Sequence, residues 1–128
     1  MATKSLSDIQ LRTMEFGVRI VELVDRMGRT LASETMARQL IRSGISIGAN
    51  MEEADGAETK KDFIHKVSLA YKEARESRYW LAVIRRTVMK SDLPVGEIWQ
   101  EAGEIVRILF AILRKSRQSA LRPAHTNP

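Results

Sequence analysis

Apolar and small residues recur at alternating steps of four and three between Asp62 and Met89, and no Gly or Pro interrupts them. These positions are Phe63, Val67, Ala70, Ala74, Ser77, Leu81, Ile84 and Val88. The spacing predicts one long helix whose apolar seam packs nearly parallel to neighbouring helices. A rise of about 1.5 Å per residue makes this helix roughly 40 Å long, and a helix of that length needs partners along its whole course.

Two further stretches show the same kind of apolar face. The first is expected to begin near Ser7 or Asp8, either of which can cap it, and to end at Gly28. Its apolar positions are Phe16, Ile20, Leu23, Val24 and Met27, with Arg12, Glu15, Arg19, Glu22 and Arg26 mostly opposite. The last helix is expected to begin at Pro94. Its seam is Ile98, Ala102, Ile105, Leu109 and Ile112.

A second helix, expected from about Ser33 to Ala54, carries Gly44, Ser46 and Gly48 at its centre. Each Gly costs about 1 kcal/mol relative to Ala in a helix, so the close approach of another backbone is expected to offset the cost. Apolar neighbours on two sides favour a helix that packs both inside its bundle and against a second object. A tight crossing within the chain alone is the alternative.

Short connections separate the four predicted helices. Gly56 is expected to adopt the left-handed conformation after the second helix, and Thr59 to cap the third, with Asp62 completing a weak capping box. The sequence thus predicts an all-α, antiparallel up-down-up-down four-helix bundle over residues 8–115. Residues 1–7 are expected to be a flexible terminus, and residues 116–128, which lack an apolar period, a disordered C-terminal tail.

Composition narrows the class of protein. The 128 residues suit one domain, and the chain has no Cys, which excludes disulfides and thiolate metal sites. No apolar run approaches the roughly 18 residues needed to span a bilayer, so we expect a cytoplasmic protein. The net charge of +5 is unevenly divided: residues 1–58 carry a net −2 and residues 59–128 a net +7. A basic second half indicates an anionic partner or, equally, ordinary solvated helix faces.

Three segments resemble a known family. They are Ser46-Ile47-Gly48-Ala49-Asn50-Met51-Glu52-Glu53-Ala54, Lys61-Asp62-Phe63-Ile64 and Ala70-Tyr71-Lys72-Glu73-Ala74-Arg75-Glu76-Ser77-Arg78-Tyr79-Trp80-Leu81. Together they resemble the bacterial four-helix-bundle proteins often encoded within intervening sequences of 23S ribosomal RNA genes. The resemblance implies a ring-like homo-oligomer, typically a pentamer. It also implies a distant similarity to the accessory protein of diversity-generating retroelements, which binds nucleic acid and its reverse transcriptase.

Catalytic motifs are missing from the sequence: there is no phosphate-binding loop, dinucleotide fingerprint or nucleophile elbow. The histidines are His65 and His125, and only Asp62 with His65 approximates the carboxylate-x-x-histidine pair of a di-iron bundle. We expect no enzyme activity, no metal and no cofactor.

Acidic residues next to the seam of the third helix have two interpretations. Glu73 and Glu76 form a second stripe with Trp80, and these carboxylates, like Glu53, are expected to pair with arginines or Asn50 across helices; a catalytic role is the alternative. The residues expected to hold the bundle or the oligomer together are Gly44, Ser46, Gly48, Asn50, Glu53, Asp62, Phe63, Glu73, Glu76 and Trp80.

Basic residues are the main functional lead. In an antiparallel bundle, the start of the third helix and the end of the fourth share one pole, while the end of the third helix lies at the other. The candidates for phosphate contacts are Lys60, Lys61, Lys66, Arg85, Arg86, Arg114, Lys115 and Arg117. Tyr71, Tyr79, Trp80 and Trp99 offer stacking surfaces for bases, or are core and interface residues. The leading hypothesis is an oligomeric bundle that binds RNA or DNA; the alternative is an oligomeric scaffold for a protein partner.

Overall fold

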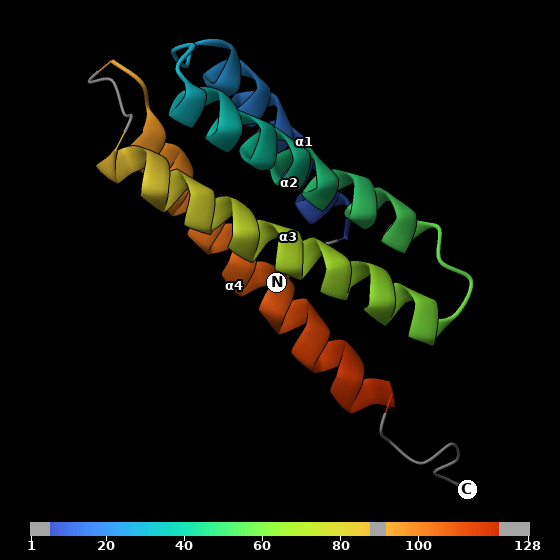
Figure 1. Cartoon of the computed structure of the whole chain (residues 1–128). Helices are drawn as coiled ribbons and strands as arrows, with labels where there is room; N and C mark the ends of the chain where they lie inside the picture. The colour runs from blue at the N-terminus through green and yellow to red at the C-terminus, as the bar shows by residue number, and fades with distance from the viewer. Residues whose placement is uncertain (1–5, 88–91, 121–128) are drawn as a thin grey trace, which may run out of the picture.

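The computed structural model describes residues 6–87 and 92–120, and within these ranges the chain forms helices and short connections without a strand. The helices are α1 (Leu6–Asp25), α2 (Leu31–Asp55), α3 (Lys60–Arg86) and α4 (Val95–Ala120) (Figure 1). The predicted all-α class with four helices is therefore confirmed. None of these helices is long and apolar enough to cross a membrane.

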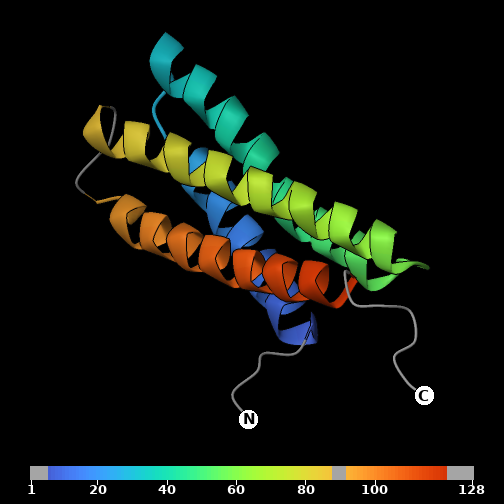
Figure 2. The same ribbon diagram turned by 90° about the horizontal axis from the view of Figure 1, so that it is seen from below.

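Helix α3 is the central element of the fold. It packs extensively against both α2 and α4, whereas α1 packs mainly against α2 and only lightly against α4. Figure 1 shows α2, α3 and α4 side by side with α1 behind α2, and Figure 2 shows the first turns of α2 diverging from α3. A helix of 27 residues is about 40 Å long and could not stand alone in water, so its neighbours on two sides hold it.

The predicted seam of α3 is its buried face. Val67, Ala70, Ala74, Ser77, Leu81 and Ile84 are all buried. Phe63 is half-buried against the core, and Val88 lies outside the described residues. Alanine and serine at the centre of the seam let two neighbouring helices approach α3 closely, and larger side chains from α1, α2 and α4 fill the remaining space. The largest fully buried ones include Phe16, Ile47, Ile105 and Leu109.

Threonine side chains begin two of the helices. Thr59 caps α3 as predicted, because its hydroxyl accepts a hydrogen bond of 3.0 Å from the Asp62 N–H. Helix α2 begins at Leu31, two residues before the predicted start, because Thr30 accepts a bond of 3.1 Å from the Ser33 N–H. The threonine cap therefore sets the start of α2.

The turn at Gly56 differs from the prediction. Gly56 has a φ of −93°, and no glycine in the described residues has a positive φ. Its N–H donates to the Glu53 carbonyl at 3.1 Å, so α2 ends by tightening its last turn. The expected left-handed conformation was wrong because this alternative satisfies the same carbonyl groups.

Both predicted chain ends were placed too far inward. Helix α1 begins at Leu6, and α4 continues to Ala120 with Ser116 buried, so residues 116–120 are helical and not a tail. The seam of α4 continues from Leu109 through Leu113 to Ser116 at steps of four and three, and the sequence interpretation missed it because its last member is polar. Residues 1–5 and 121–128 lie outside the described residues.

The glycines of α2 face α1. A Cβ atom added to Gly44 would lie 2.9 Å from two side-chain carbons of Ile20, and one added to Gly48 would lie 3.4 Å from the backbone of Thr13. The predicted close approach is thus a contact within the chain, which accounts for both glycines. Packing of α2 against a second object stays a prediction.

Candidate functional site

Glu73 and Glu76 of α3 bind Arg42 of α2. The guanidinium of Arg42 contacts Glu73 Oε1 at 3.3 Å and also donates to Glu76 Oε2. The Trp80 indole N–H donates to the same Glu76 oxygen at 3.0 Å. These donors stabilise the charged carboxylate, chiefly the indole N–H and then Arg42, so they hold the pKa of Glu76 below its ordinary value. The arrangement links two helices through one carboxylate oxygen of Glu76.

The other polar residues of α2 that the sequence singled out make structural contacts. Asn50 donates to the Ser46 carbonyl at 2.9 Å, and the Ser46 hydroxyl donates to the Arg42 carbonyl at 2.6 Å, both within α2. Glu53 pairs instead with Lys66 of α3 at 2.7 Å, which raises the pKa of Lys66. Lys66 is consequently neutralised in part and is a weaker candidate for phosphate contacts.

A buried serine pair joins α2 to α3, and the sequence interpretation did not find it. The Ser77 hydroxyl donates to the Ser43 hydroxyl at 2.8 Å, and Ser43 donates to the Leu40 carbonyl at 3.3 Å. Both side chains are fully buried, so the small seam residue Ser77 carries polar specificity as well as close packing.

The basic residues at the start of α3 lie beside the end of α4. Lys60, Lys61 and Ile64 line a shallow hollow of about 500 Å³ together with Ala120. The side chains of Arg114, Lys115 and Arg117 are exposed on the last turns of α4. The structure therefore brings together the two helix ends that carry these residues, except that Lys66 is paired with Glu53.

Arg85, at the other end of α3, is part of an arginine and tryptophan cluster. The Cζ atoms of Arg78 and Arg85 lie 4.8 Å and 5.3 Å from the ring centroid of Trp99 on α4. Gly103 makes room for Arg78, because a Cβ added there would lie 3.3 Å from Arg78 Nε, whereas one added to Gly96 would meet Arg85 Cζ at an ordinary 3.8 Å. Arg78 was not among the predicted basic candidates. The seven-residue spacing of the arginines, which puts both on one helix face, was the available signal. Arg86 is exposed nearby.

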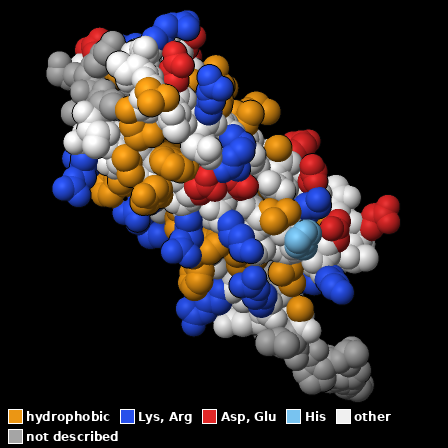
Figure 3. All heavy atoms as spheres, viewed as in Figure 1, with side chains coloured by type: hydrophobic (Ala, Val, Ile, Leu, Met, Phe, Trp, Pro, Cys, Tyr) orange, Lys and Arg blue, Asp and Glu red, His pale blue; other side chains and the backbone are white. Residues whose placement is uncertain are grey.

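Within the described residues, most Lys and Arg side chains of α3 and α4 have no carboxylate partner. The exceptions are Lys66, which pairs with Glu53, and Arg107, which pairs with Glu104. The cause is the position of α1, whose arginines bind the carboxylates of α4. Arg12 forms two hydrogen bonds with Glu101, at 2.6 Å and 2.8 Å, and a third with Glu104 at 3.0 Å. Figure 3 shows the resulting spread of Lys and Arg side chains over α3 and α4, with a group of Asp and Glu side chains near the turn between α2 and α3.

An exposed apolar face on α1 was also missed at the sequence level. The α1 outer face consists of Leu11, Met14, Val18 and Val21, each between 45% and 61% exposed. The steps of three, four and three between these residues are the same signal that revealed the seam of α3. Beside this face, Met14, Val18 and Ile45 line a groove of about 510 Å³ between α1 and α2. Helix α1 thus has two apolar stripes: one packs against its own chain, and the α1 outer face is exposed in the part of the chain that the structure describes.

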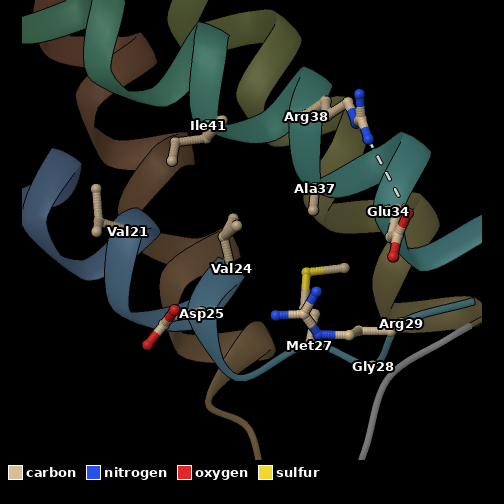
Figure 4. Close-up of a pocket in the computed structure, with 10 residues that line it drawn as sticks. All are labelled: Val21, Val24, Asp25, Met27, Gly28, Arg29, Glu34, Ala37, Arg38 and Ile41. Carbon is tan, nitrogen blue, oxygen red and sulfur yellow. Dashed lines mark ion pairs between the residues drawn. The ribbon is translucent and has the colours of Figure 1, made fainter.

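A second hollow, of about 420 Å³, lies where α1 connects to α2 (Figure 4). Val21 lines both this hollow and the groove between α1 and α2, so the apolar surface continues from the groove toward Val24 and Ile41. Arg38 and Glu34 form an ion pair of 4.0 Å at its edge.

No three His, Asp or Glu side chains in the described part of the chain lie close enough together to hold a metal ion. His65 is exposed on α3, and His125 lies outside the described residues. Asp62 sits at the capped start of α3, where its role is that of an N-terminal helix residue.

The fold defines the class: an all-α protein of four helices. Within that class, the profile of the family described as 23S rRNA-intervening sequence protein matches residues 7–111. The chain therefore belongs to this family. It is also similar to a crystallised protein of unknown function from the S23 ribosomal protein family of Bacteroides thetaiotaomicron VPI-5482, with 36% sequence identity and a TM-score of 0.72. That match covers 85% of this chain and 97% of the other. A comparison with curated proteins gave no match.

Proposed function

We propose that this protein is a non-enzymatic, oligomeric helical bundle of the cytoplasm that binds RNA or DNA phosphates through basic residues of α3 and α4. The observation that carries the proposal is the set of Lys and Arg side chains on these helices that have no carboxylate partner in the described ranges. Polyanion binding releases counterions from the nucleic acid, and exposed, unpaired cations supply that free energy best. The proposal requires no cofactor.

The charge distribution supports this choice of surface. Arg12 forms ion pairs with Glu101 and Glu104, so the negative charge of α4 on the side that faces α1 is neutralised. The opposite side of α4 and the neighbouring side of α3 consequently carry excess positive charge, most of it exposed. Repetition of this surface around a symmetric oligomer would multiply the field that a nucleic acid feels.

Family membership supports the same class of partner. The family is described by reference to 23S rRNA, and the similar crystallised protein carries the name of a ribosomal protein family although its function is unknown. The more distant resemblance to the accessory protein of diversity-generating retroelements stays a prediction from sequence. Together these points favour nucleic acid over a purely structural role for the basic surface.

The proposed assembly is a ring-like homo-oligomer, with a pentamer favoured by the resemblance, built from antiparallel up-down-up-down bundles. The α1 outer face supports it, because a continuous exposed apolar stripe next to a groove is what a second copy of the chain would cover. Burying this stripe between copies would leave α3 and α4 facing outward, available to nucleic acid.

The test is binding of fluorescent single-stranded, duplex and structured RNA and DNA across a salt series, with the mass of the protein measured in the same buffer. Affinity is expected to fall steeply with salt. Arg85→Glu with Arg86→Glu, or Arg114→Glu with Lys115→Glu and Arg117→Glu, is expected to abolish binding at moderate salt. Arg29→Glu with Arg38→Glu, which alters the same number of charges as the first variant on exposed positions away from α3 and α4, serves as its control.

Unchanged affinity in both α3 and α4 variants would contradict the proposal. The alternative function, an oligomeric scaffold for a protein partner, is favoured if no nucleic acid binds even at low salt. A pull-down from lysate treated with nuclease separates the two, because a directly bound protein survives the treatment and a partner bridged by nucleic acid does not.

A further inference from the structure

The arginine and tryptophan cluster of Arg78, Arg85 and Trp99 has the geometry of a preorganised anion site. Both guanidiniums come from one helix and approach one indole ring, at 4.8 Å and 5.3 Å from its centroid. A guanidinium held over an aromatic ring loses rotational freedom before any ligand binds, and its N–H edge keeps its donors for a phosphate. Gly103 leaves the space that Arg78 needs on α4.

The charges of the cluster are not compensated by the surrounding carboxylates. In the part of the chain that the structure describes, neither Arg78 nor Arg85 forms an ion pair, and the carboxylates of α4 are engaged elsewhere: Glu97 with Arg19, Glu101 with Arg12, and Glu104 with Arg12 and Arg107. Each guanidinium therefore carries a positive charge that a bound anion would neutralise. The two oxygens of a phosphate match the planar fork of an arginine.

A hollow next to the cluster has the lining that a nucleobase prefers. Its volume is about 360 Å³, and its walls are Arg75, Arg78, Tyr79, Ala82, Trp99 and Val106. Tyr79 is 60% exposed, and its ring makes a T-shaped contact with the ring of Trp80 at 5.2 Å between centroids. An exposed aromatic ring that is fixed by a neighbour gives a base a stacking surface at low entropic cost.

We propose that Arg78 and Arg85 contact backbone phosphates of single-stranded nucleic acid, while an adjoining unpaired base stacks on Tyr79 in the hollow beside Trp99. This inference rests on the proposed function and deepens it, because it names the strandedness of the ligand and two residues, Arg78 and Tyr79, outside the general basic set. Bases in a duplex are stacked and paired, so they cannot reach Tyr79, and a duplex can use only the phosphate contacts.

The experiment compares binding of a labelled oligouridylate of about 12 nucleotides with binding of a duplex of equal length. The variant Arg78→Lys with Arg85→Lys keeps both charges but removes the planar, stacked forks, so oligouridylate affinity is expected to fall about tenfold with little change in the salt dependence. Tyr79→Leu is expected to reduce the preference for the single strand and to leave duplex affinity unchanged. Arg38→Lys on α2 is the control and is expected to change neither affinity.

Trp99 emission provides a second readout that does not depend on the arginine variants. In a Trp80→Phe background, Trp99 is the remaining tryptophan, and oligouridylate is expected to change its fluorescence in parallel with the binding curve. Failure of every probe to bind would overturn both this inference and the proposed function. Binding that leaves Trp99 emission unchanged and is insensitive to Arg78→Lys with Arg85→Lys would overturn the inference alone and place the nucleic acid elsewhere on the basic surface.

Discussion

At the scale of single residues, Glu76 shows how a sequence candidate for catalysis becomes a structural link. Its carboxylate accepts from the Trp80 indole on its own helix and from Arg42 on α2, so all its close partners are donors that favour the ionised form. A general acid needs the opposite arrangement, in which burial or a like charge raises the pKa toward neutrality. The contacts of Glu76 therefore argue for stability and register rather than proton transfer.

This arrangement predicts a pH-dependent stability. Because the pKa of Glu76 is lowered from its ordinary value of 4.5 in the folded chain, its contribution is fully present above pH 4.5 and is lost as the pH falls through the folded value. Glu76→Gln is expected to destabilise the protein by less than about 1 kcal/mol at neutral pH, since 36% of the side chain is exposed and water screens the pair. The thermal unfolding difference from wild type should shrink below pH 4.5.

Glu97→Gln is the control, because Glu97 is 79% exposed and its contact with Arg19 is long, at 3.8 Å. This variant should show a smaller effect at neutral pH. A Glu76→Gln difference that stays constant across the acid range would refute the assigned ion pairing.

The buried serine pair gives a prediction with a definite order. Ser43→Ala leaves the Ser77 hydroxyl without its acceptor, whereas Ser77→Ala leaves Ser43 still bonded to the Leu40 carbonyl. We expect Ser43→Ala to cost about 1–3 kcal/mol and Ser77→Ala less, measured by urea unfolding at fixed protein concentration. The double variant should cost less than the sum of the two, because no buried donor is then orphaned. Strict additivity would show that the two hydroxyls do not interact.

At the scale of elements, the crossing of α1 over α2 depends on Gly44. Ile20 is fully buried and β-branched, and even its Cβ would lie 3.2 Å from a methyl group placed on Gly44, so the side chain cannot rotate away. Glycine fits this position because the two helices pack at a distance that leaves no room for a larger residue.

Gly44→Ala is therefore expected to lower the free energy of unfolding by about 1 kcal/mol or more, because overpacking at a rigid contact outweighs the roughly 1 kcal/mol gained in helix propensity. Gly17→Ala is the matched control: its added methyl would meet α2 at an ordinary 3.8 Å. That variant should unfold at an equal or higher temperature than wild type. Stabilisation by both substitutions would mean that α1 can move away from α2 freely.

At the scale of the whole molecule, the α1 outer face and the basic surface of α3 and α4 lie on different helices. In the proposed function, this separation would let one face hold copies of the chain together while another meets a polyanion. Helix α1 also supports the basic surface indirectly, because its arginines occupy the carboxylates of α4.

Association through α1 predicts that Met14→Glu with Val18→Glu will reduce the mass of the particle to that of one chain, measured by size exclusion with light scattering. A buried carboxylate without a partner is costly at an apolar interface, whereas on an exposed helix it is tolerated. Leu31→Glu is the control: Leu31 is 87% exposed and outside the α1 outer face. Equal mass for wild type and the Met14, Val18 variant would exclude this face as the interface.

Much of the fold followed from local chemistry. The four-three spacing from Val67 to Ile84 gave the buried seam of α3, and Thr59 gave its start, because helix periodicity and capping depend on residues within one or two turns. The errors were also local. The apolar pattern of α4 ends before Ser116 because serine is polar, although Ser116 is buried. A left-handed conformation is the usual expectation for Gly56, although a tighter turn with negative φ satisfies the same carbonyl groups.

The partners of the charged residues came only from the tertiary structure. The helices, their apolar faces and the excess of positive charge after residue 58 follow from the amino-acid sequence alone. The packing of α1 on α2 decided that Arg12 would take carboxylates from α4, and the packing of α3 on α4 decided that Arg78 and Arg85 would share Trp99. Periodicity specifies which side of a helix is buried, but the strength of an ion pair or a ring contact depends on distances of a few ångströms between helices, which are set only when the helices pack.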